Sequence, residues 1–190
     1  MIDRRNFLTG ALGLAATAAV SGTGEAFAQA VTPSASRIEQ ELQAAPRRKL
    51  APQERVTVQE LRRRPELRRM APSIDIQSIN FAFGSAEIPY SQYGKVEAIA
   101  DALHGLLSRN PGAKVLIEGH TDAVGSDGSN YFLSEQRAAS LKATLVNEFD
   151  VPRRALETVG YGEEFLLVPT YDENWQNRRV TLRRADAFLR

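Results

Sequence analysis

The order of apolar patterns in the C-terminal two-thirds of the chain most constrains what it can fold into. Apolar residues alternate with smaller or polar ones over 74–83, which predicts a strand, and a phase slip at 77–78 predicts a bulge within it. Over 91–108 and 134–149 apolar residues recur every three or four positions, which predicts two helices that each bury one face.

Three further segments complete this pattern as strands. Residues 115–117 are continuously apolar, as expected of a strand that is covered on both faces. Segments 156–161 and 179–183 are also predicted strands. The order β-α-β-α-β-β predicts an α/β fold, an α+β two-layer sandwich with a mixed sheet, in a domain that spans 73–190.

Residues 1–30 have the pattern of a targeting peptide. A basic pair, Arg4 and Arg5, precedes a weakly apolar run, and small residues allow cleavage after Ala28 or Ala30. The run is too short to span a membrane, so no membrane-spanning segment is expected after removal. The order of residues 3–8 resembles a twin-arginine export signal; ordinary secretion or a retained anchor are the alternatives.

The absence of cysteine excludes several classes of site and anchor. It rules out disulfides, thiolate metal sites, cysteine nucleophiles and the acylated cysteine of a lipoprotein. Hydrophobic residues make up 43% and charged residues 25%, which is typical of a soluble globular protein.

Residues 31–72 differ from the rest in proline content and charge. Five prolines interrupt this segment, so only short helices fit between them, at 36–45 and 57–64. From Arg37 to Pro72 there are ten Lys/Arg against five Glu, whereas 73–190 carries twelve against sixteen acidic residues. This composition predicts a mostly extended basic tether.

Three interpretations of the arginine runs in this tether stay open. They are a solvated surface, a contact with an acidic surface such as wall carboxylates or the domain's own acidic face, or a docking site for another envelope protein. Aromatic residues do not interleave with the arginines, which disfavours nucleic acid as a partner.

One acidic and one basic residue are the main site candidates. Asp122 follows the predicted strand 115–117, and Arg137 is expected in the first turn of the helix 134–149. A carboxylate and a guanidinium across one pocket suit a zwitterion, because the acid accepts from an ammonium and the arginine donates to a carboxylate. The N-terminus of a helix would add a preference for an anion.

Residues 79–184 resemble the OmpA-like C-terminal domain, which is shared with Pal lipoproteins and the flagellar motor protein MotB. The resemblance rests on five blocks in the right order: Phe81–Ala86; Glu118–Asp122 with Gly125 and Ser126; Asn130 with Leu133–Ala138; Gly160–Glu163; and Asn177–Val180.

This resemblance implies non-covalent binding to the diaminopimelate in the peptide stems of peptidoglycan. It implies that Asp122 meets the ammonium and Arg137 the carboxylate at one end of that group. Thr121, Asn130, Leu133 and Arg178 match positions that line or brace the pocket. It also implies an OmpA-like fold, a periplasmic location and no cofactor.

Other roles for these residues are compatible with the sequence. Asp122 could cap a turn and Arg137 could pair with Glu135 or Glu118, while Arg178 and Arg179 could be structural. His120 could serve a metal or act as a base, although His104 is the only other histidine. A hydrolase would need Ser126 or Ser134 activated by His120, and no third orienting group is evident. We therefore expect a binding module without a metal, and not an enzyme.

Overall fold

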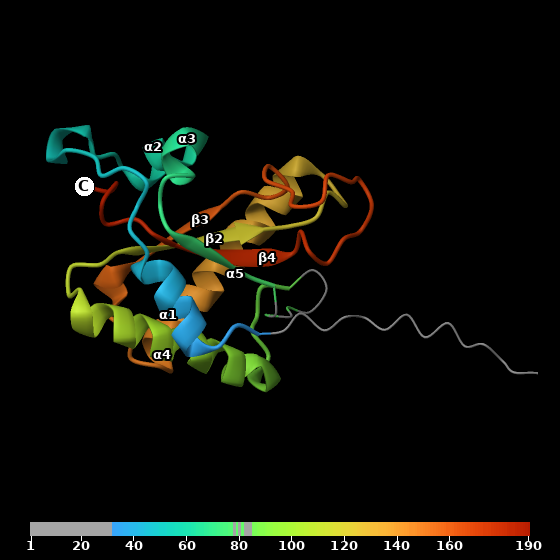
Figure 1. The fold of residues 1–190 in the computed structure, drawn as a ribbon. Helices are drawn as coiled ribbons and strands as arrows, with labels where there is room; N and C mark the ends of the chain where they lie inside the picture. Colours follow the sequence, from blue (N-terminus) through green and yellow to red (C-terminus); the bar gives the residue numbers. More distant parts are fainter. Residues whose placement is uncertain (1–31, 78, 80, 82–84) are drawn as a thin grey trace, which may run out of the picture.

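A four-stranded mixed sheet organises the chain (Figure 1). The computed structural model describes residues 32–190 except 78, 80 and 82–84. The strand order is β1-β4-β2-β3, in which β4 runs antiparallel to β1 and β2, and β2 runs parallel to β3. The strands are β1 (Ser73–Ile76), β2 (Val115–His120), β3 (Leu156–Gly160) and β4 (Arg179–Arg184).

Three helices cover one face of the sheet, and the first and the third of them along the chain contact its strands. The helices are α4 (Tyr93–Arg109), α5 (Asp127–Asn147) and α1 (Ala35–Gln43). α5 packs on β2 and β3, while α1 packs on α4. Short helices complete the structure: α2 (Val58–Arg62), α3 (Pro65–Arg68), η1 (Pro52–Glu54), η2 (Tyr90–Gln92) and η3 (Arg153–Ala155).

The predicted α/β fold with a mixed sheet is confirmed, because β1, α4, β2, α5, β3 and β4 follow one another in the expected order. The first strand is shorter than predicted, since β1 ends at Ile76. The Gln77 side chain donates to the Gln176 carbonyl at 3.3 Å, and Ile79 and Phe81 lie outside regular structure. The predicted bulge and the end of that strand fall partly on residues outside the described ones.

The second long helix begins seven residues before the predicted start. Ser126 caps it, because its hydroxyl accepts from the Ser129 N–H at 3.3 Å, and Asp127 places a negative charge in the first turn. The expected loop at 125–130 is therefore mostly helix. Arg137 lies in the middle of α5, so the prediction that it sits in the first turn, beside an anion-binding helix end, is wrong.

The helix-covered face of the sheet is apolar. Val115, Ile117 and Leu182 point toward α4 and α5 and join a buried core with side chains such as Leu103 and Leu141. Each of these five side chains is at most 1% exposed. The 3.6-residue periodicity predicted the helix side of this core, and the apolar run at 115–117 predicted part of its strand side.

Residues 46–72 cover the opposite face of the sheet, which corrects the prediction of an extended tether. Figure 1 shows α2 and α3 on the side of the sheet opposite α1 and α4. Leu61 of α2 is fully buried in a second core with Leu116, Val159 and Phe188. The prolines shorten the helices without preventing this packing, because Pro65 begins α3, where its missing N–H costs nothing.

The rest of residues 32–72 is anchored in the same way. The helices expected at 36–45 and 57–64 are present as α1 and α2. Ile38 and Leu42 of α1 are fully buried in the first core. Val56 forms a bridge with Leu189, near the end of the described chain. Residues 32–72 thus pack on both sides of the sheet.

A buried charged cluster joins this cover to the sheet. Glu118 of β2 is fully buried and accepts from Arg68 of α3 at 2.7 Å and from Arg183 of β4 at 2.6 Å. The Arg68 guanidinium also lies 4.5 Å from the centre of the Tyr161 ring and 4.2 Å from that of Phe165. Burial alone would raise the pKa of Glu118, but His120, Arg183 and Arg68 together hold it well below its usual range.

Within the described ranges, no helix is long and apolar enough to cross a membrane.

Candidate functional site: a buried carboxylate and a buried guanidinium

The loop after β2 carries the candidate carboxylate. Thr121 follows the last residue of β2, and its N–H donates to the Gly162 carbonyl at 2.9 Å. This bond ties the loop to the turn after β3. Asp122 comes next and is only 7% exposed. The backbone of two neighbouring strand ends therefore positions this carboxylate.

α5 lies unusually close to these strand ends because two glycines face it. A Cβ atom on Gly119 would clash with the Ser134 carbonyl, and one on Gly160 would lie 2.5 Å from the Glu135 nitrogen. The Ser134 hydroxyl accepts from the Gly162 N–H at 2.8 Å and donates to the Tyr131 carbonyl at 2.7 Å. The middle of α5 is thus fixed directly above the loop that holds Asp122.

Arg178 and Asn130 hold Asp122 from two sides. Nη1 of Arg178 donates to Oδ2 of Asp122 at 2.8 Å and to Glu173 at 2.6 Å. Burial alone would lower the pKa of Arg178, but these two carboxylates raise it. Nδ2 of Asn130 donates to the Asp122 carbonyl at 3.3 Å and to Glu163 at 2.6 Å. Oδ1 of Asp122 has no hydrogen-bond partner among the described residues.

Arg137 supplies the guanidinium from α5. It is 8% exposed; its Nε donates to the Ser85 carbonyl at 3.2 Å, and its guanidinium carbon lies 5.0 Å from the centre of the Phe81 ring. Nη1 and Nη2 make no hydrogen bond to any residue that the structure describes. Burial lowers the pKa of Arg137, Arg178 lowers it further and Asp122 raises it. Asp122, Arg137 and Arg178 therefore share one electrostatic environment.

The remaining predicted site residues lie around this group in different ways. Thr121 is 2% exposed, and its hydroxyl has no hydrogen-bond partner within the described part of the chain. Leu133 is half-buried and lies four residues before Arg137 on α5, so both occupy the same side of the helix. Asp122, Asn130 and Arg178 are joined by the hydrogen bonds given above, whereas Asp122 and Arg137 make no direct ion pair.

The structural pairings considered for Arg137 are not the ones observed. Glu118 points to the opposite face of the sheet, where it binds Arg68 and Arg183. No ion pair joins Glu135 and Arg137 among the described residues. Arg179 diverges from its neighbour Arg178, because it lies on that opposite face with Asp75, at 3.3 Å. Arg179 is thus structural, while Arg178 belongs to the site.

His120 is buried on the face of the sheet away from α5. Its ring stacks on Tyr161 with centroids 5.6 Å apart, and its Nε2 lies 3.8 Å from Glu118, beyond hydrogen-bond distance. Burial, aided by the charges of Arg179 and Arg68, lowers the pKa of His120 to about 4. The ring is therefore neutral near pH 7.

Among the residues that the structure describes, no set of metal ligands and no serine lies on the His120 side of the sheet in an arrangement for catalysis. The described residues contain no cluster of three potential His, Cys, Asp or Glu ligands. Ser126 caps α5, and Ser134 lies over Gly119, whose neighbour His120 points to the other face. His120 is thus separated by the sheet from the serine nearest to it in the fold.

Several residues that shape the site were not predicted as site residues. Phe81, Ser85 and Glu163 belong to the sequence blocks that carry the family resemblance, so the signal for them was present. Glu173 lies in the irregular loop between β3 and β4, and no pattern in the sequence pointed to it.

Several known proteins are similar in sequence to part of this chain. Outer membrane porin F of Pseudomonas aeruginosa is 33% identical over 109 residues, which is 57% of this chain and 29% of the porin. The peptidoglycan-associated lipoprotein of Haemophilus influenzae is 39% identical over 95 residues, which is 49% of this chain and 61% of the lipoprotein. The chain spans less than a third of the length of the porin and less than two-thirds of the lipoprotein.

A solved structure and a family match complete the comparison. The periplasmic domain of Helicobacter pylori MotB has a TM-score of 0.51 and 20% identity, covers 60% of this chain and 75% of that domain, and shares the fold. The OmpA family matches residues 80–181, which is more than half of the chain and includes β2, α5, β3 and the whole of the site. The chain therefore belongs to the OmpA family.

Proposed function

We propose that this chain binds peptidoglycan non-covalently through the diaminopimelate of its peptide stems, as a binding module of the cell envelope and not as an enzyme. A relative of the same family is a peptidoglycan-associated lipoprotein, and the site of this chain has the charges that such a ligand requires. An amino-acid group presents one ammonium and one carboxylate within a few bonds of each other. It needs an acidic and a basic partner at matching separation.

One observation carries the proposal: each of the two key side chains is held at one end and open at the other. Arg137 is held by Ser85 through Nε, which leaves its two Nη groups to bind a carboxylate with two parallel hydrogen bonds. Asp122 is held by Arg178 through Oδ2, which leaves Oδ1 to accept from an ammonium. Both side chains are already buried, so little ordering is needed when the ligand binds.

Arg178 adds selectivity to this arrangement. Its bond to Asp122 holds that carboxylate in place, while its charge disfavours a second cation nearby unless that cation brings a carboxylate for Arg137. A zwitterionic end is thus favoured over a simple amine. Thr121 and Leu133 would line the same space, with a free hydroxyl and a half-buried apolar side chain.

Binding to a single stem is expected to be weak and binding to the polymer strong. Removing the charges of the ligand from water offsets much of their attraction to Asp122 and Arg137, so we expect micromolar to millimolar dissociation constants for an isolated stem. A sacculus presents many stems, which raises the apparent affinity by avidity.

Co-sedimentation with purified sacculi tests the proposal. Asp122→Asn removes the charge and keeps the shape, and Arg137→Lys keeps the charge and loses the two-pronged donor. Matched controls are Asp127→Asn in the first turn of α5 and Arg153→Lys, both exposed and outside the site. We expect both site variants to pellet at least about tenfold less protein, and both controls to pellet like the wild type.

Two further measurements distinguish loss of ligand binding from unfolding of the variants and from non-specific adsorption to the sacculi. Thermal unfolding of the site variants should stay cooperative. Free diaminopimelate should release the wild-type protein, whereas lysine with its α-amine and α-carboxylate both blocked, which presents only a simple amine, should not. Unchanged pelleting of both site variants would overturn the proposal.

We also place the protein in the periplasm of a Gram-negative bacterium, after export and removal of residues 1–30. The relatives include outer membrane and peptidoglycan-associated proteins, which supports the envelope. The twin-arginine pair predicts the route. Arg4→Lys with Arg5→Lys should keep the protein in the cytoplasm, as cell fractionation would show, and normal export of that variant would point to ordinary secretion.

A further inference from the structure

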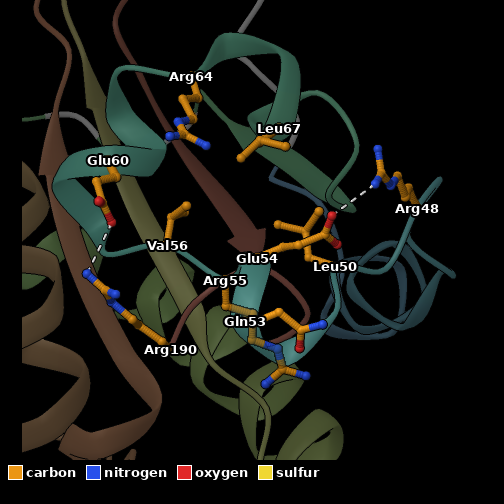
Figure 2. A pocket seen from close by; sticks show the side chains of 10 residues that line it. All are labelled: Arg48, Leu50, Gln53, Glu54, Arg55, Val56, Glu60, Arg64, Leu67 and Arg190. Carbon is orange, nitrogen blue, oxygen red and sulfur yellow. Dashed lines mark hydrogen bonds and ion pairs between the residues drawn. The ribbon is translucent and has the colours of Figure 1, made fainter.

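A cavity of about 440 Å³ lies away from the peptidoglycan site, between residues 48–67 and Arg190 (Figure 2). No residue that lines it belongs to the site around Asp122 and Arg137. β4 begins beside that site, at Arg179, and ends at Arg184, from which the chain leads on to Arg190. The cavity is therefore separate from that site. It is formed mainly by the cover, residues 46–72, which the sequence had predicted to be an extended tether.

The side chains around this cavity carry an excess of positive charge. Four arginines line it against two glutamates: Arg48, Arg55, Arg64 and Arg190 with Glu54 and Glu60. The only ion pairs among these six are long and exposed. Arg48 meets Glu54 at 3.5 Å and Arg190 meets Glu60 at 3.5 Å, and in both pairs each side chain is at least 46% exposed. Such pairs exchange partners easily.

Both glutamates are already used to hold the backbone of the cover. Glu54 accepts from the Ala51 N–H at 3.0 Å, and Glu60 accepts from the N–H and hydroxyl of Thr57 at 2.7 and 3.0 Å. The Thr57 bonds are the main reason why the pKa of Glu60 lies below its usual value, and Arg190 and Arg64 add to this. The glutamates thus cap helices and leave much of the arginine charge uncompensated.

Two of the arginines have N–H donors without a partner among the described residues. Arg55 and Arg64 make no ion pair and no side-chain hydrogen bond to any described residue, and the Nε of Arg55 is buried without a partner. The terminal N–H groups of these two guanidiniums are the donors that an incoming anion can use. Figure 2 shows Arg64 on one side of the apolar side chains of Leu50, Val56 and Leu67 and Arg55 on the other.

We propose that this cavity binds an acidic segment of a partner protein, with two carboxylates for Arg55 and Arg64 and an apolar side chain between them for the surface of Leu50, Val56 and Leu67. The volume falls within the range of about 300–1,000 Å³ that is typical of ligand pockets. The two arginines can bind carboxylates in the two-pronged mode.

The apolar surface favours a peptide over the other anions that arginines bind. A free phosphate would satisfy a guanidinium but would leave Leu50, Val56 and Leu67 without a contact. A membrane surface would need apolar side chains that project outward, and Leu50 and Val56 are only 7% and 4% exposed. A side chain entering the cavity can reach them, whereas a flat surface cannot.

Binding of a short labelled peptide tests this inference. The probe is a blocked hexapeptide of alternating glutamate and leucine, compared with the same peptide containing glutamine, and binding to the mature chain is followed by fluorescence anisotropy. We expect saturable binding of the glutamate peptide alone. Arg55→Ala with Arg64→Ala should weaken it at least about tenfold, because hydrogen bonds to charged groups are lost.

The controls separate this site from general basicity and from the proposed function. Arg69→Ala removes an exposed arginine of the same cover outside the cavity, and it should leave peptide binding unchanged. The Arg55 and Arg64 double variant should still pellet with sacculi, whereas Asp122→Asn should still bind the peptide. Failure of one activity then does not imply failure of the other.

Three results would overturn the inference. These are absence of binding by the glutamate peptide, equal binding by the glutamine peptide, or an unchanged affinity in the double variant with the fold intact. Inorganic phosphate or vesicles of anionic lipid that bind through Arg55 and Arg64 when the peptide does not would assign the cavity to a phosphate-bearing ligand instead.

Discussion

The two faces of the sheet are covered by two different kinds of chemistry. On the helix face, Val115, Ile117 and Leu182 meet apolar side chains of α4 and α5. On the other face, Glu118 and Arg183 meet Arg68 of the cover, with an apolar core beside them. Apolar packing tolerates many partners of suitable volume, whereas a buried charge requires a particular partner at a particular place.

This difference indicates that residues 46–72 are a specific cover and not a connector. The cover brings one arginine to a carboxylate that would otherwise be neutralised by Arg183 alone. It also stacks Arg68 on Tyr161 and Phe165. These two aromatic residues flank the turn at 162–164, which Thr121 and Asn130 contact through hydrogen bonds. The second face thereby supports the loop that carries Asp122 of the candidate site.

Removal of the cover together with α1 should have the largest effect. A chain that begins at Ser73 would expose Leu116, Val159 and Phe188 and would lose the buried Ile38 and Leu42. We expect loss of most of the free energy of unfolding, which for a small domain is about 5–15 kcal/mol. Urea unfolding against a chain that begins at Thr32 would measure it. Equal stability of the two chains would restore the view of this segment as a tether.

Truncation of the buried carboxylate should come next. Glu118→Ala leaves Arg68 and Arg183 buried without their acceptor, which should cost about 3–5 kcal/mol in the free energy of unfolding. Leu141→Ala on the helix face gives the matching apolar loss, about 2–5 kcal/mol.

A triple replacement then sharpens the comparison between the faces. Glu118→Leu combined with Arg68→Met and Arg183→Met should recover most of the stability, because an apolar set of similar volume carries no desolvation cost. If the triple variant is as unstable as Glu118→Ala, the buried charges contribute net stability in addition to structural specificity.

Acid should weaken the charged face before the apolar one, through His120. Its pKa is 6.5 in the unfolded chain and about 4 in the folded one, so the unfolded state binds more protons between these values. The neutral His120 ring then makes its full contribution to stability above pH 6.5. The free energy of unfolding falls as the pH drops from 6.5 to 4, by up to roughly 3 kcal/mol. His120→Phe should remove this slope in urea unfolding at stepped pH, while His104→Gln should keep it. An identical slope in the Phe variant would assign the loss to carboxylates.

The smallest effect is expected for an exposed pair on the helix side. Arg109 of α4 binds Glu39 of α1 at 2.6 Å, with side chains 65% and 19% exposed. Arg109→Ala should cost less than about 1 kcal/mol, and less still in high salt. A larger loss in thermal unfolding would mean that α1 depends on this pair more than on its buried Ile38 and Leu42.

The element order could be predicted because periodicity is a local property of the sequence. Val115 to Ile117 and the apolar positions of α4 and α5 needed no knowledge of distant residues. The start of α5 was missed because Gly128 and its polar neighbours resemble a loop, and one hydroxyl, that of Ser126, outweighs that composition by capping the helix.

The cover could not be predicted in the same way. Its decisive contacts join Arg68 to Glu118 and to Arg183, fifty and more positions away, and no spacing in the sequence records such a pairing. Of the site, the convergence of Asp122 and Arg137 followed from the family resemblance. The supports supplied by Ser85 and Glu173 depend on irregular loops, whose course the sequence pattern does not reveal.

The two glycines beneath α5 have a consequence for ligand choice. Because Gly119 and Gly160 let the helix backbone rest on the strand ends, the gap between the acidic and basic groups is set by main-chain contact and not by side chains that can adjust. The separation between these two groups is therefore fixed by the backbone. An alanine at Gly119 would push α5 away from the strand ends and widen the gap between Asp122 and Arg137, so we expect it to weaken binding of the proposed ligand.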